Sequence, residues 1–548
     1  AIGRNALLAN TTADNNTAVG VDALTANTTG SENVAVGLDA LQANTTASDN
    51  VGVGHSALEA NTTGAGNTAV GKNALGANTT ASYNTAVGYG NLVANTTGAN
   101  NVALGTDTLK ANTTGGSNVA VGNSALDANT TASNNTAIGQ SSLGANTTGY
   151  NNTAVGKDSL TTNTTGVNNT AQGLGALQLN TTGGSNVAVG LNALNANTTA
   201  SNNTAVGYNS LVANTTASGG TAVGASALVA NTTGARNTAV GQAAAPANTT
   251  GTDNTALGNS SLESNTEGDN NTAVGRLALY ANTTADNNTA VGISAGAAVT
   301  TGTQNTFVGA LAGDATDDGA YNTAVGYLAL SANCGDSNTA VGYQAGTAIT
   351  GATNVCLGTQ AGYNITSGSN NVIIGKLSYA SAAGGNNQIV IGDSVGGSGN
   401  DNFTFGSGTT DSNIAFGATT ITAPSDGRYK EEIVDATAGL SFINDLRPVT
   451  FKWKKEKDLP SDHRAYVEDS ETRTMNDYTN HGFIAQEVKT AIDAHAEIKD
   501  GFEMWQADET DGRQRLGPSA LVPMLVKAIQ EQQTIIEALT ARITTLEG

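Results

Sequence analysis

Basic residues are scarce in this chain: 22 Lys and Arg stand against 44 Asp and Glu, and the net charge is −22. Such a surface has no basic patch to meet phosphates, which argues against nucleic acid and anionic membranes as partners. No apolar stretch approaches the ~20 residues of a membrane-spanning helix, so membrane insertion is not expected. Aromatic residues make up only 4% of the chain, with two cysteines and six prolines.

Glycine, by contrast, is abundant, with 68 copies, and it recurs at a fixed interval. From Gly3 to Gly326 a glycine stands every 17 residues, at 20 positions in one register. The interval shortens to 16 at Gly342 and Gly358, then returns to 17. A short fixed period indicates a solenoid, in which each unit stacks on the next. Residues 1–392 are therefore predicted to form a repetitive parallel β-roll or β-solenoid shaft.

Each unit contains a short strand, such as the run Asn-Val-Ala-Val-Gly that ends at Gly37. Side chains alternate between the two faces of a strand, so Val34 and Val36 share one face and Ala35 takes the other. We place the Val positions inside the coil. The opposite position is Ala in nearly every unit, and this uniform smallness predicts a second chain close to that face.

The remaining repeat positions complete the predicted coil. Leu24 and its equivalents supply the other half of the interior, and Gly ends the strand with a backbone angle that other residues resist. Asn27, Asn44 and Asn61 are predicted to form a ladder in which side-chain amides bond from coil to coil.

A few coils depart from the pattern. Gln172 stands where other coils have Val, so we expect its amide to be hydrogen-bonded within the coil. Ile373 and Val390 replace the small Ala, which predicts a wider separation of chains over residues 370–392. Cys334 and Cys356 occupy different repeat positions, so two buried thiols are expected rather than a disulfide.

The Asn-Thr-Ala-Val-Gly strand and the Ala-Asn-Thr-Thr-Gly return resemble the head repeats of YadA-like trimeric adhesins and related repeats of phage tail fibres. The resemblance covers residues 1 to about 392 and implies a trimeric, left-handed parallel β-roll. The 17-residue period is longer than the adhesin unit, so the solenoid class is better supported than the shape of the coil. Ala1 falls inside a repeat, and we expect the chain to be part of a longer protein.

Composition changes at residue 425. Residues 1–424 hold 7 Lys and Arg and 21 Asp and Glu, whereas residues 425–548 hold 15 and 23, together with both tryptophans and three of the four histidines. Residues 393–424 lose the period and are predicted to form a short β connector. Residues 425–548 are predicted to be a separate α+β domain.

Within that domain the spacing predicts individual elements. Leu440, Ile443 and Leu446 have helical spacing, and residues 449–453 alternate as a strand. Residues 481–488 indicate a strand followed by a helix, and Leu516-Gly517-Pro518 leads into the last helix. That helix carries heptads, with Ile529, Ile536 and Ile543 at one core position and Leu525, Gln532, Leu539 and Leu546 at the other. Ile at a with Leu at d by itself favours a two-stranded coiled coil.

The domain resembles the endosialidase-type intramolecular chaperone, a self-cleaving peptidase domain found at the C-termini of phage tailspikes and fibres. Three motifs agree across residues 425–548: Ser-Asp-x-Arg-x-Lys, Leu-Arg-Pro-Val-x-Phe-x-Trp and Gly-Phe-Ile-Ala-Gln-Glu. The resemblance implies that the domain trimerises the chain, assists folding of the shaft and then cuts itself off. It further implies that Ser425 is the nucleophile, that Lys430 is its general base and that Pro424–Ser425 is the scissile bond.

The motif departs from the family pattern at Tyr429, where an aliphatic residue is usual, and at Gly427, a loosely defined position. Neither change removes a reacting group, because a serine hydroxyl needs only a neighbouring base, which a lysine of lowered pKa can supply. Asp426 and Arg428 are candidates to support the dyad. The alternative for Ser425 is a helix N-cap with Asp426 in the first turn and a solvated Lys430.

His481 and Glu487 could assist the dyad, although a structural role is the favoured interpretation for both. We expect no cofactor and no metal ion.

The favoured function is a structural and adhesive fibre: a homotrimeric phage tail fibre or tailspike shaft located in the virion. Its expected partners are a host cell-surface receptor, either glycan or protein, and upstream fibre or baseplate proteins. The main alternative is a bacterial trimeric surface adhesin, but such adhesins end in a membrane-anchoring barrel. An ice-binding protein is less favoured, because the adjacent threonines of Asn-Thr-Thr point to opposite faces. A glycan-cleaving enzyme is least favoured, since the shaft has few carboxylate pairs.

Overall fold

A computed structural model describes the chain from residue 1 to residue 548 except residues 424, 426, 462, 464, 501 and 508–513. The chain divides into two compact units, Ala1–Pro424 and Ser425–Gly548. Each unit is described by itself below. Pro424 and Asp426, both predicted to take part in chemistry, lie outside the described residues.

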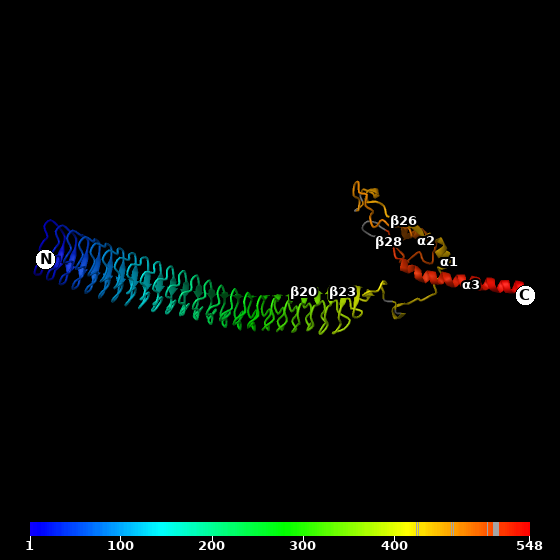
Figure 1. Cartoon of the computed structure of the whole chain (residues 1–548), viewed down its shortest axis with the longest axis horizontal. Coiled ribbons are helices and arrows are strands. Elements are labelled where there is room, and N and C mark those ends of the chain that lie inside the picture. The colour runs from blue at the N-terminus through cyan, green and yellow to red at the C-terminus, as the bar shows by residue number, and fades with distance from the viewer. Residues whose placement is uncertain (424, 426, 462, 464, 501, 508–513) are drawn as a thin grey trace. The chain divides into compact units, whose positions relative to one another are not determined.

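The first unit is a parallel β-solenoid of about 23 turns, built from 17-residue repeats (Figure 1). Each coil contributes one three-residue strand, and each strand pairs in parallel and in register with the strands before and after it. The strands of regular length are β1 Thr17–Val19, β2 Val34–Val36, β3 Val51–Val53, β4 Thr68–Val70, β5 Thr85–Val87, β6 Val102–Leu104, β7 Val119–Val121, β8 Thr136–Ile138, β9 Thr153–Val155, β10 Thr170–Gln172, β11 Val187–Val189, β12 Thr204–Val206, β13 Thr221–Val223, β14 Thr238–Val240, β15 Thr255–Leu257, β16 Thr272–Val274, β17 Thr289–Val291, β18 Thr306–Val308, β19 Thr323–Val325, β20 Thr339–Val341, β21 Val355–Leu357 and β22 Val372–Ile374. The predicted solenoid class is confirmed.

The other half of each coil is made of turns rather than a second strand. Leu24 and its equivalents have positive φ, 54° at Leu24, and so do the polar residues two positions earlier, such as Asp22 at 58°. Asn and Asp adopt this region more readily than most residues, which explains their frequency at that position. For Leu the conformation is unfavourable, and burial of its side chain, worth ~1.5–3 kcal/mol, offsets the cost.

Backbone hydrogen bonds join neighbouring coils on the turn half as well as on the strand half. Leu24 N–H donates to the Ala40 carbonyl at 3.0 Å, and Ala26 N–H donates to the Gln42 carbonyl at 3.1 Å. The glycine that ends each strand permits the close stacking. At Gly156 φ is +134°, and a Cβ would lie 2.5 Å from the Gly173 carbonyl oxygen. The 17-residue glycine period is therefore a stack of positions that cannot accommodate a side chain.

The interior of the coil is lined by Ala and Leu, and the Val positions face outward. Ala35 and Leu41 are fully buried, whereas Val34 and Val36 are only half-buried. Our prediction that Val lies inside and Ala faces another chain is wrong. The turn half of the coil brings a Leu side chain so close to the strand that only a small residue fits opposite it. Ala is uniform because the coil is thin.

Phe307 shows how strictly the interior volume is limited. It replaces the interior Ala in β18 and is fully buried. The Leu position is Gly both in the turn before β18, at Gly296, and in the turn after it, at Gly313. A Cβ on Gly313 would lie 2.4 Å from the Phe307 ring, and one on Gly296 would lie 2.8 Å away. The two glycines thus vacate the volume that the phenylalanine fills.

Two ladders of buried asparagine run along the solenoid. In the predicted ladder, Asn44 Nδ2 donates to Asn27 Oδ1 at 2.9 Å and to its own coil at the Ala47 carbonyl. Asn61 Nδ2 continues it to Asn44 Oδ1 at 2.9 Å, so this prediction is confirmed. A second ladder, which was not predicted, precedes the strand: Asn33 Nδ2 donates to the Ala47 carbonyl of the next coil at 2.9 Å.

The first ladder ends at Asn282, because the next coil has Val299 at that position. Val299 has no N–H to donate from its side chain, so Asn282 Oδ1 is buried without a hydrogen-bond partner. In three coils beyond this point the apolar residue has changed place: Gly stands at the Leu position, and Val299, Ile349 and Ile365 fill the Asn position, fully buried. The interior seam is apolar in these coils, whereas Leu330 keeps the Leu position of its coil and Thr316 keeps a polar group.

The other sequence exceptions also follow the corrected orientation of the strand. Gln172 is exposed on the outer face of β10, so the prediction of an amide bonded within the coil is wrong. Ile373 and Val390 are fully buried inside their coils, so the premise of the predicted wider separation, that they face another chain, is wrong. Cys334 and Cys356 are free and buried, and burial raises the pKa of the Cys356 thiol to about 12.

Longer strands close the solenoid at its C-terminal end. β23 Gln388–Asp393 pairs in parallel with β24 Asn402–Ser407, which pairs antiparallel with β25 Thr410–Ala415. Thr422 bonds back to Asn413 at 2.7–2.8 Å. The hairpin covers the last open strand edge, which would otherwise be free to pair with another chain.

Within its described residues, the second unit contains three α-helices and two small antiparallel strand pairs. The helices are α1 Leu440–Asp445, α2 Ala485–Ala494 and α3 Leu521–Glu547, and the 3-10 turns are η1 Gly427–Tyr429, η2 Glu456–Asp458 and η3 Pro518–Ala520. The strands are β26 Val449–Phe451 paired with β27 Asn480–Gly482, and β28 Trp505–Ala507 paired with β29 Gln514–Leu516. The predicted helices and the predicted strand–helix order are confirmed.

A small core joins these elements. Phe442 of α1, Val488 and Ile492 of α2, Met504 and Leu521 are all buried together. Glu531 of α3 accepts a hydrogen bond from the N–H of Leu440 at 2.7 Å, which fixes the start of α1 against α3. In the described part of the chain, no helix is long and apolar enough to cross a membrane.

Candidate functional site

Ser425 and Lys430 stand at the start of the second unit, within the motif singled out in the sequence. The turn η1 lies between them, and Lys430 N–H donates to the Gly427 carbonyl at 3.2 Å. This single tight turn reverses the chain, so that residues five positions apart face each other. Lys430 Nζ then donates to Ser425 Oγ at 2.7 Å.

The contact provides the two groups of a serine–lysine dyad. The hydroxyl is the nucleophile, and an amine at hydrogen-bonding distance can take its proton if the amine is itself unprotonated. Both side chains are exposed in the single chain. Serine–lysine dyads act in surroundings shielded from water, because burial disfavours a charged amine. The geometry for proton transfer is therefore present in one chain, whereas the desolvation is not.

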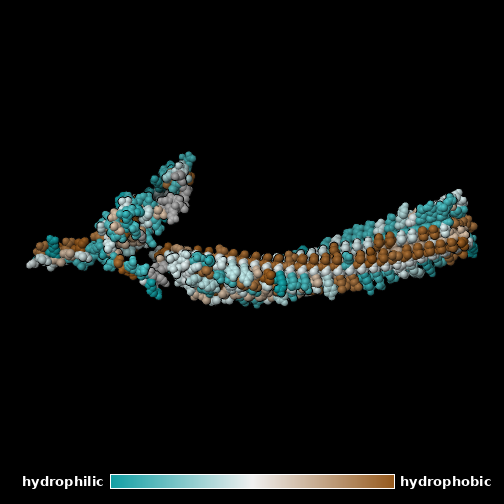
Figure 2. All heavy atoms as spheres, turned by 180° about the vertical axis from the view of Figure 1, so that it is seen from behind, coloured by the Kyte–Doolittle hydropathy of each residue, from teal (hydrophilic) through white to brown (hydrophobic). Residues whose placement is uncertain are grey.

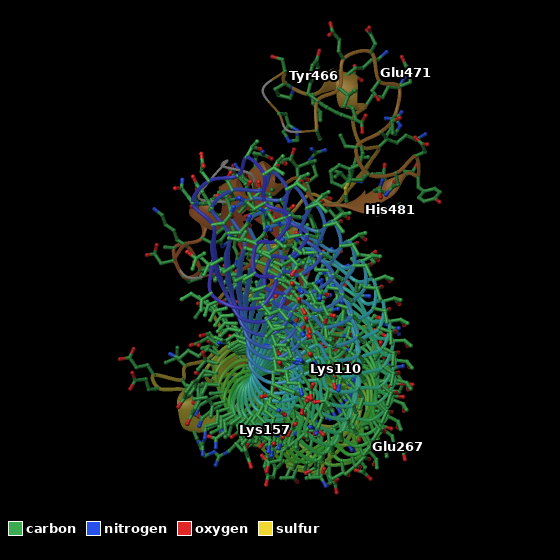
Figure 3. All side chains as sticks on the ribbon, turned by 90° about the vertical axis from the view of Figure 1, so that its left-hand side faces the viewer. Lys110, Lys157, Glu267, Tyr466, Glu471 and His481 are labelled. Carbon is green, nitrogen blue, oxygen red and sulfur yellow. The ribbon has the colours of Figure 1, made fainter. Side chains whose placement is uncertain are left out.

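The other predicted site residues are distributed as follows. Arg428 lies within η1 and is exposed. His481 lies in β27, opposite Thr450 of β26, and is exposed at the surface of the unit (Figure 3). Among the described residues, no hydrogen bond joins His481 or Glu487 to the dyad.

Glu487 has a structural partner instead. The Arg447 guanidinium donates Nε–H to Glu487 Oε2 at 2.9 Å, and a second bond joins Nη2 to Oε1. This fork holds the pKa of the Glu487 carboxyl below its usual range and raises that of Arg447. The pair ties Arg447, two residues before β26, to the first turn of α2. The structural interpretation of Glu487 is thus the one that its contacts support.

A second polar cluster was not found from the sequence. His495 Nε2 bonds Asp445 Oδ2 at 2.8 Å, and Nδ1 bonds Glu497 Oε1 at 3.1 Å. The ring also packs edge-on against Phe442, with centroids 5.4 Å apart. The hydrogen bond with Asp445 raises the pKa of His495 above its usual value. His495 and Asp445 are fifty residues apart, and no local pattern links them.

No group of three or more metal-ligating side chains is gathered anywhere in the residues that the structure describes. A pocket of about 460 Å³ is lined by Trp453, Leu459, His463, Thr474 and Met475 among others. It contains neither member of the dyad.

A long solenoid shaft followed by a small unit of this kind fits a tailspike-like structural protein with a C-terminal chaperone domain. Residues 425–497 match the family described as "Chaperone of endosialidase". The match begins at Ser425 and ends before α3, so it is shorter than the expected 425–548. A search of curated proteins found no match to the chain.

Proposed function

We propose that this chain is a structural and adhesive fibre protein, the shaft of a homotrimeric phage tail fibre or tailspike located in the virion. Its C-terminal unit drives trimerisation and folding of the solenoid and then cleaves itself off at Pro424–Ser425. The main support for the cleavage proposal is the 2.7 Å hydrogen bond between Lys430 Nζ and Ser425 Oγ. The family match begins at the same serine, which supports the same bond as the cleavage point.

The apolar face of α3 supports assembly through the C-terminal unit. Ile529, Ile536 and Ile543 are each more than half exposed in the single chain, and so are Leu539 and Leu546. A helix that leaves such a heptad seam uncovered is typical of a coiled coil. The number of chains is taken from the family, because Ile at a with Leu at d does not by itself specify three.

Cleavage in this proposal takes place once per chain, after assembly. Ser425 Oγ attacks the carbonyl carbon of Pro424 while Lys430 accepts the hydroxyl proton. The bond to the Ser425 nitrogen breaks, and that nitrogen leaves as an amine after gaining a proton. Water then hydrolyses the ester, which releases the Pro424 carboxylate and restores the hydroxyl. In the assembled trimer, neighbouring chains would bury the dyad and exclude water from it.

The shaft then remains as the adhesive part, with a host cell-surface receptor as its partner at one end and fibre or baseplate proteins at the other. A bacterial trimeric surface adhesin is supported only by the repeats. The chaperone match at residues 425–497 favours the fibre.

Denaturing electrophoresis of the expressed chain, with N-terminal sequencing of any small product, tests the chemistry. We expect a fragment that spans residues 425–548 and begins at Ser425. Ser425→Ala and Lys430→Ala should leave the chain intact but still trimeric, because assembly depends on packing rather than on the hydroxyl.

Ser441→Ala and Lys452→Ala are matched controls, since both residues are exposed in the same unit. Both variants should be cleaved like the wild type. If the assembled wild-type trimer stays full length, the cleavage proposal is wrong, and the C-terminal unit is a permanent part of the fibre.

A further inference from the structure

The residue that follows the strand-ending glycine forms a row of its own along the shaft. Figure 2 shows how coil positions continue lengthwise as hydrophobic and polar rows. The Gln344 N–H donates to the Tyr327 carbonyl at 2.9 Å, and such bonds keep this row in step from coil to coil. Tyr327 and Tyr343 therefore occupy the same position of adjacent coils.

These two residues, which we call the tyrosine pair, are stacked on each other and open to solvent. Their ring centroids lie 5.7 Å apart, and their planes differ by 17°. Tyr327 is 45% exposed and Tyr343 is 49% exposed in the single chain. Each ring holds the other in place, whereas a solitary exposed tyrosine has to be ordered by its ligand at a cost in entropy. The tyrosine pair is therefore pre-organised to present its ring faces.

Small residues stand on both sides of the tyrosine pair in the same row. Ala310 precedes Tyr327 by one coil, and the Leu328 N–H bonds the Ala310 carbonyl at 3.2 Å. Thr359 follows Tyr343 by one coil. Because the two rings face each other, the second face of each is turned toward one of these small residues. Each outer face therefore has room for a flat ligand.

The charge of this part of the shaft limits the kind of ligand. Residues 277–375 contain five Asp and no Lys, Arg or Glu. An anionic ligand would meet no cation there and would be repelled. None of the five Asp stands in the row of the tyrosine pair or in the next row, so the rings adjoin uncharged groups.

The polar groups next to the tyrosine pair are amides and hydroxyls. Gln344 follows Tyr343 in the chain, Gln360 follows Thr359, and Gln360 Nε2 donates to Gln344 Oε1 at 2.9 Å. Amides and hydroxyls both donate and accept hydrogen bonds, which suits a neutral ligand rich in hydroxyl groups.

We propose that the outer faces of the tyrosine pair bind neutral hexopyranose rings, the glucose or galactose units of a cell-surface glycan. The face of an aromatic ring carries partial negative charge, and the C–H groups on one side of a pyranose ring carry partial positive charge, so the two rings stack. The amides and hydroxyls bond the sugar hydroxyls. The inference rests on the proposed adhesive fibre and names its receptor as a neutral glycan.

Saturation-transfer NMR on the full-length chain tests the site, with lactose and cellobiose as neutral probes. We expect transfer to the ring C–H protons of both sugars. Tyr327→Ala and Tyr343→Ala should each weaken binding about tenfold, because each removes one stacking face and releases the other ring. The anionic 3′-sialyllactose should bind more weakly than lactose.

A double variant separates binding from folding. Ala310→Tyr with Thr359→Tyr covers both outer faces and leaves the tyrosine pair intact, and the added rings would adjoin the larger Ile293 and Lys376 in the row. We expect it to bind about tenfold more weakly than the wild type without a lower melting temperature.

Tyr89→Ala is the matched control. Tyr89 is 53% exposed at the same coil position, but its neighbours in the row are Lys72 and Thr106, so no second ring holds it in place. This variant should bind both sugars like the wild type.

Light scattering and the cleavage assay on the same samples separate this inference from the proposed fibre. Transfer that is lost in the tyrosine-pair variants and in the double variant, but not in Tyr89→Ala, supports the site. A cleaved trimer without transfer to either neutral sugar overturns the site and leaves the fibre in place. Equal loss in Tyr89→Ala, unchanged binding by the double variant, or binding of choline in place of the sugars also overturns it. A monomeric, uncleaved chain that binds the sugars overturns the fibre and supports the site.

Discussion

At the scale of single residues, the interior of the coil is a space with room for one Ala and one Leu per turn. Ala154 and its equivalents are fully buried, and Leu143 and Leu160 fill the facing positions. Phe307 is tolerated because both facing positions in its coils are glycine. Side-chain volume is therefore shared between adjacent coils, and a change in one must be matched in the next.

Because volume is shared in this way, we predict that a large residue at Ala154 destabilises the shaft and that smaller facing residues partly restore its stability. Ala154→Phe should lower the stability of the shaft by at least ~1–3 kcal/mol, because the ring overpacks the coil. Adding Leu143→Gly and Leu160→Gly reproduces the surroundings of Phe307 and should restore part of the loss. Thermal melting of the three proteins checks this, with Gln140→Phe on the exposed surface as the control. A triple variant that melts below Ala154→Phe would show that volume is not the limiting factor.

At the scale of elements, the asparagine ladder links one coil to the next through side chains. Asn163 Nδ2 donates to Asn146 Oδ1 at 2.9 Å, and Asn163 Oδ1 accepts from Asn180 Nδ2 at 2.8 Å. Each interior asparagine is thus bonded in both directions. Asn282 is bonded in one direction only, since its Oδ1 has no partner.

The two positions should differ in their response to the same substitution. Asn163→Val leaves both ladder neighbours with an unpaired group, whereas Asn282→Val leaves one and stands next to Val299 of the following coil. Each buried unpaired polar group costs ~1–3 kcal/mol, so Asn163→Val should destabilise the shaft by about that much more. Melting temperatures of the two variants, measured side by side, test the difference. Equal losses would mean that the ladder bonds contribute little.

In the C-terminal unit, His495 joins the end of α1 to the segment after α2. Its pKa is raised by Asp445, so the stabilisation is complete below the unfolded value of ~6.5 and is lost as the pH rises through the folded pKa. We expect the melting temperature of this unit to fall as the pH rises above about 6.5, and to fall less in Asp445→Asn. Asp435→Asn, at an exposed position, is the control. An unchanged slope in Asp445→Asn would exclude this linkage.

At the scale of the whole molecule, the two units differ in what stabilises them and in the role we propose for each. The solenoid has a narrow interior and buries little apolar surface per residue, so its stability depends on many repeated hydrogen bonds and, in our proposal, on neighbouring shafts. Its strand pairings join residues of adjacent coils, 17 apart in β1 and β2. Folding of such a stack starts at one coil and then spreads to its neighbours. A compact unit with its own core and an uncovered heptad helix, placed at the C-terminal end, is suited to bring chains together there. In our proposal the unit has no further structural task once the shaft is assembled, and it is then cleaved off at Ser425.

The sequence by itself determined the solenoid, its strand positions, the ladder through Asn27 and Asn44 and the helices of the second unit, because each follows from a local period. It also indicated the Ser425–Lys430 pair through a short motif. Alternation in Val34, Ala35 and Val36 predicted two faces but not which of them lies inside. That choice was decided by the tertiary structure, since the turn half of the coil, 6 to 11 residues away in sequence, leaves room only for Ala. The exposed Gln172 and the pairing of Asp445 with His495 were decided in the same way, by contacts between segments that no local pattern connects.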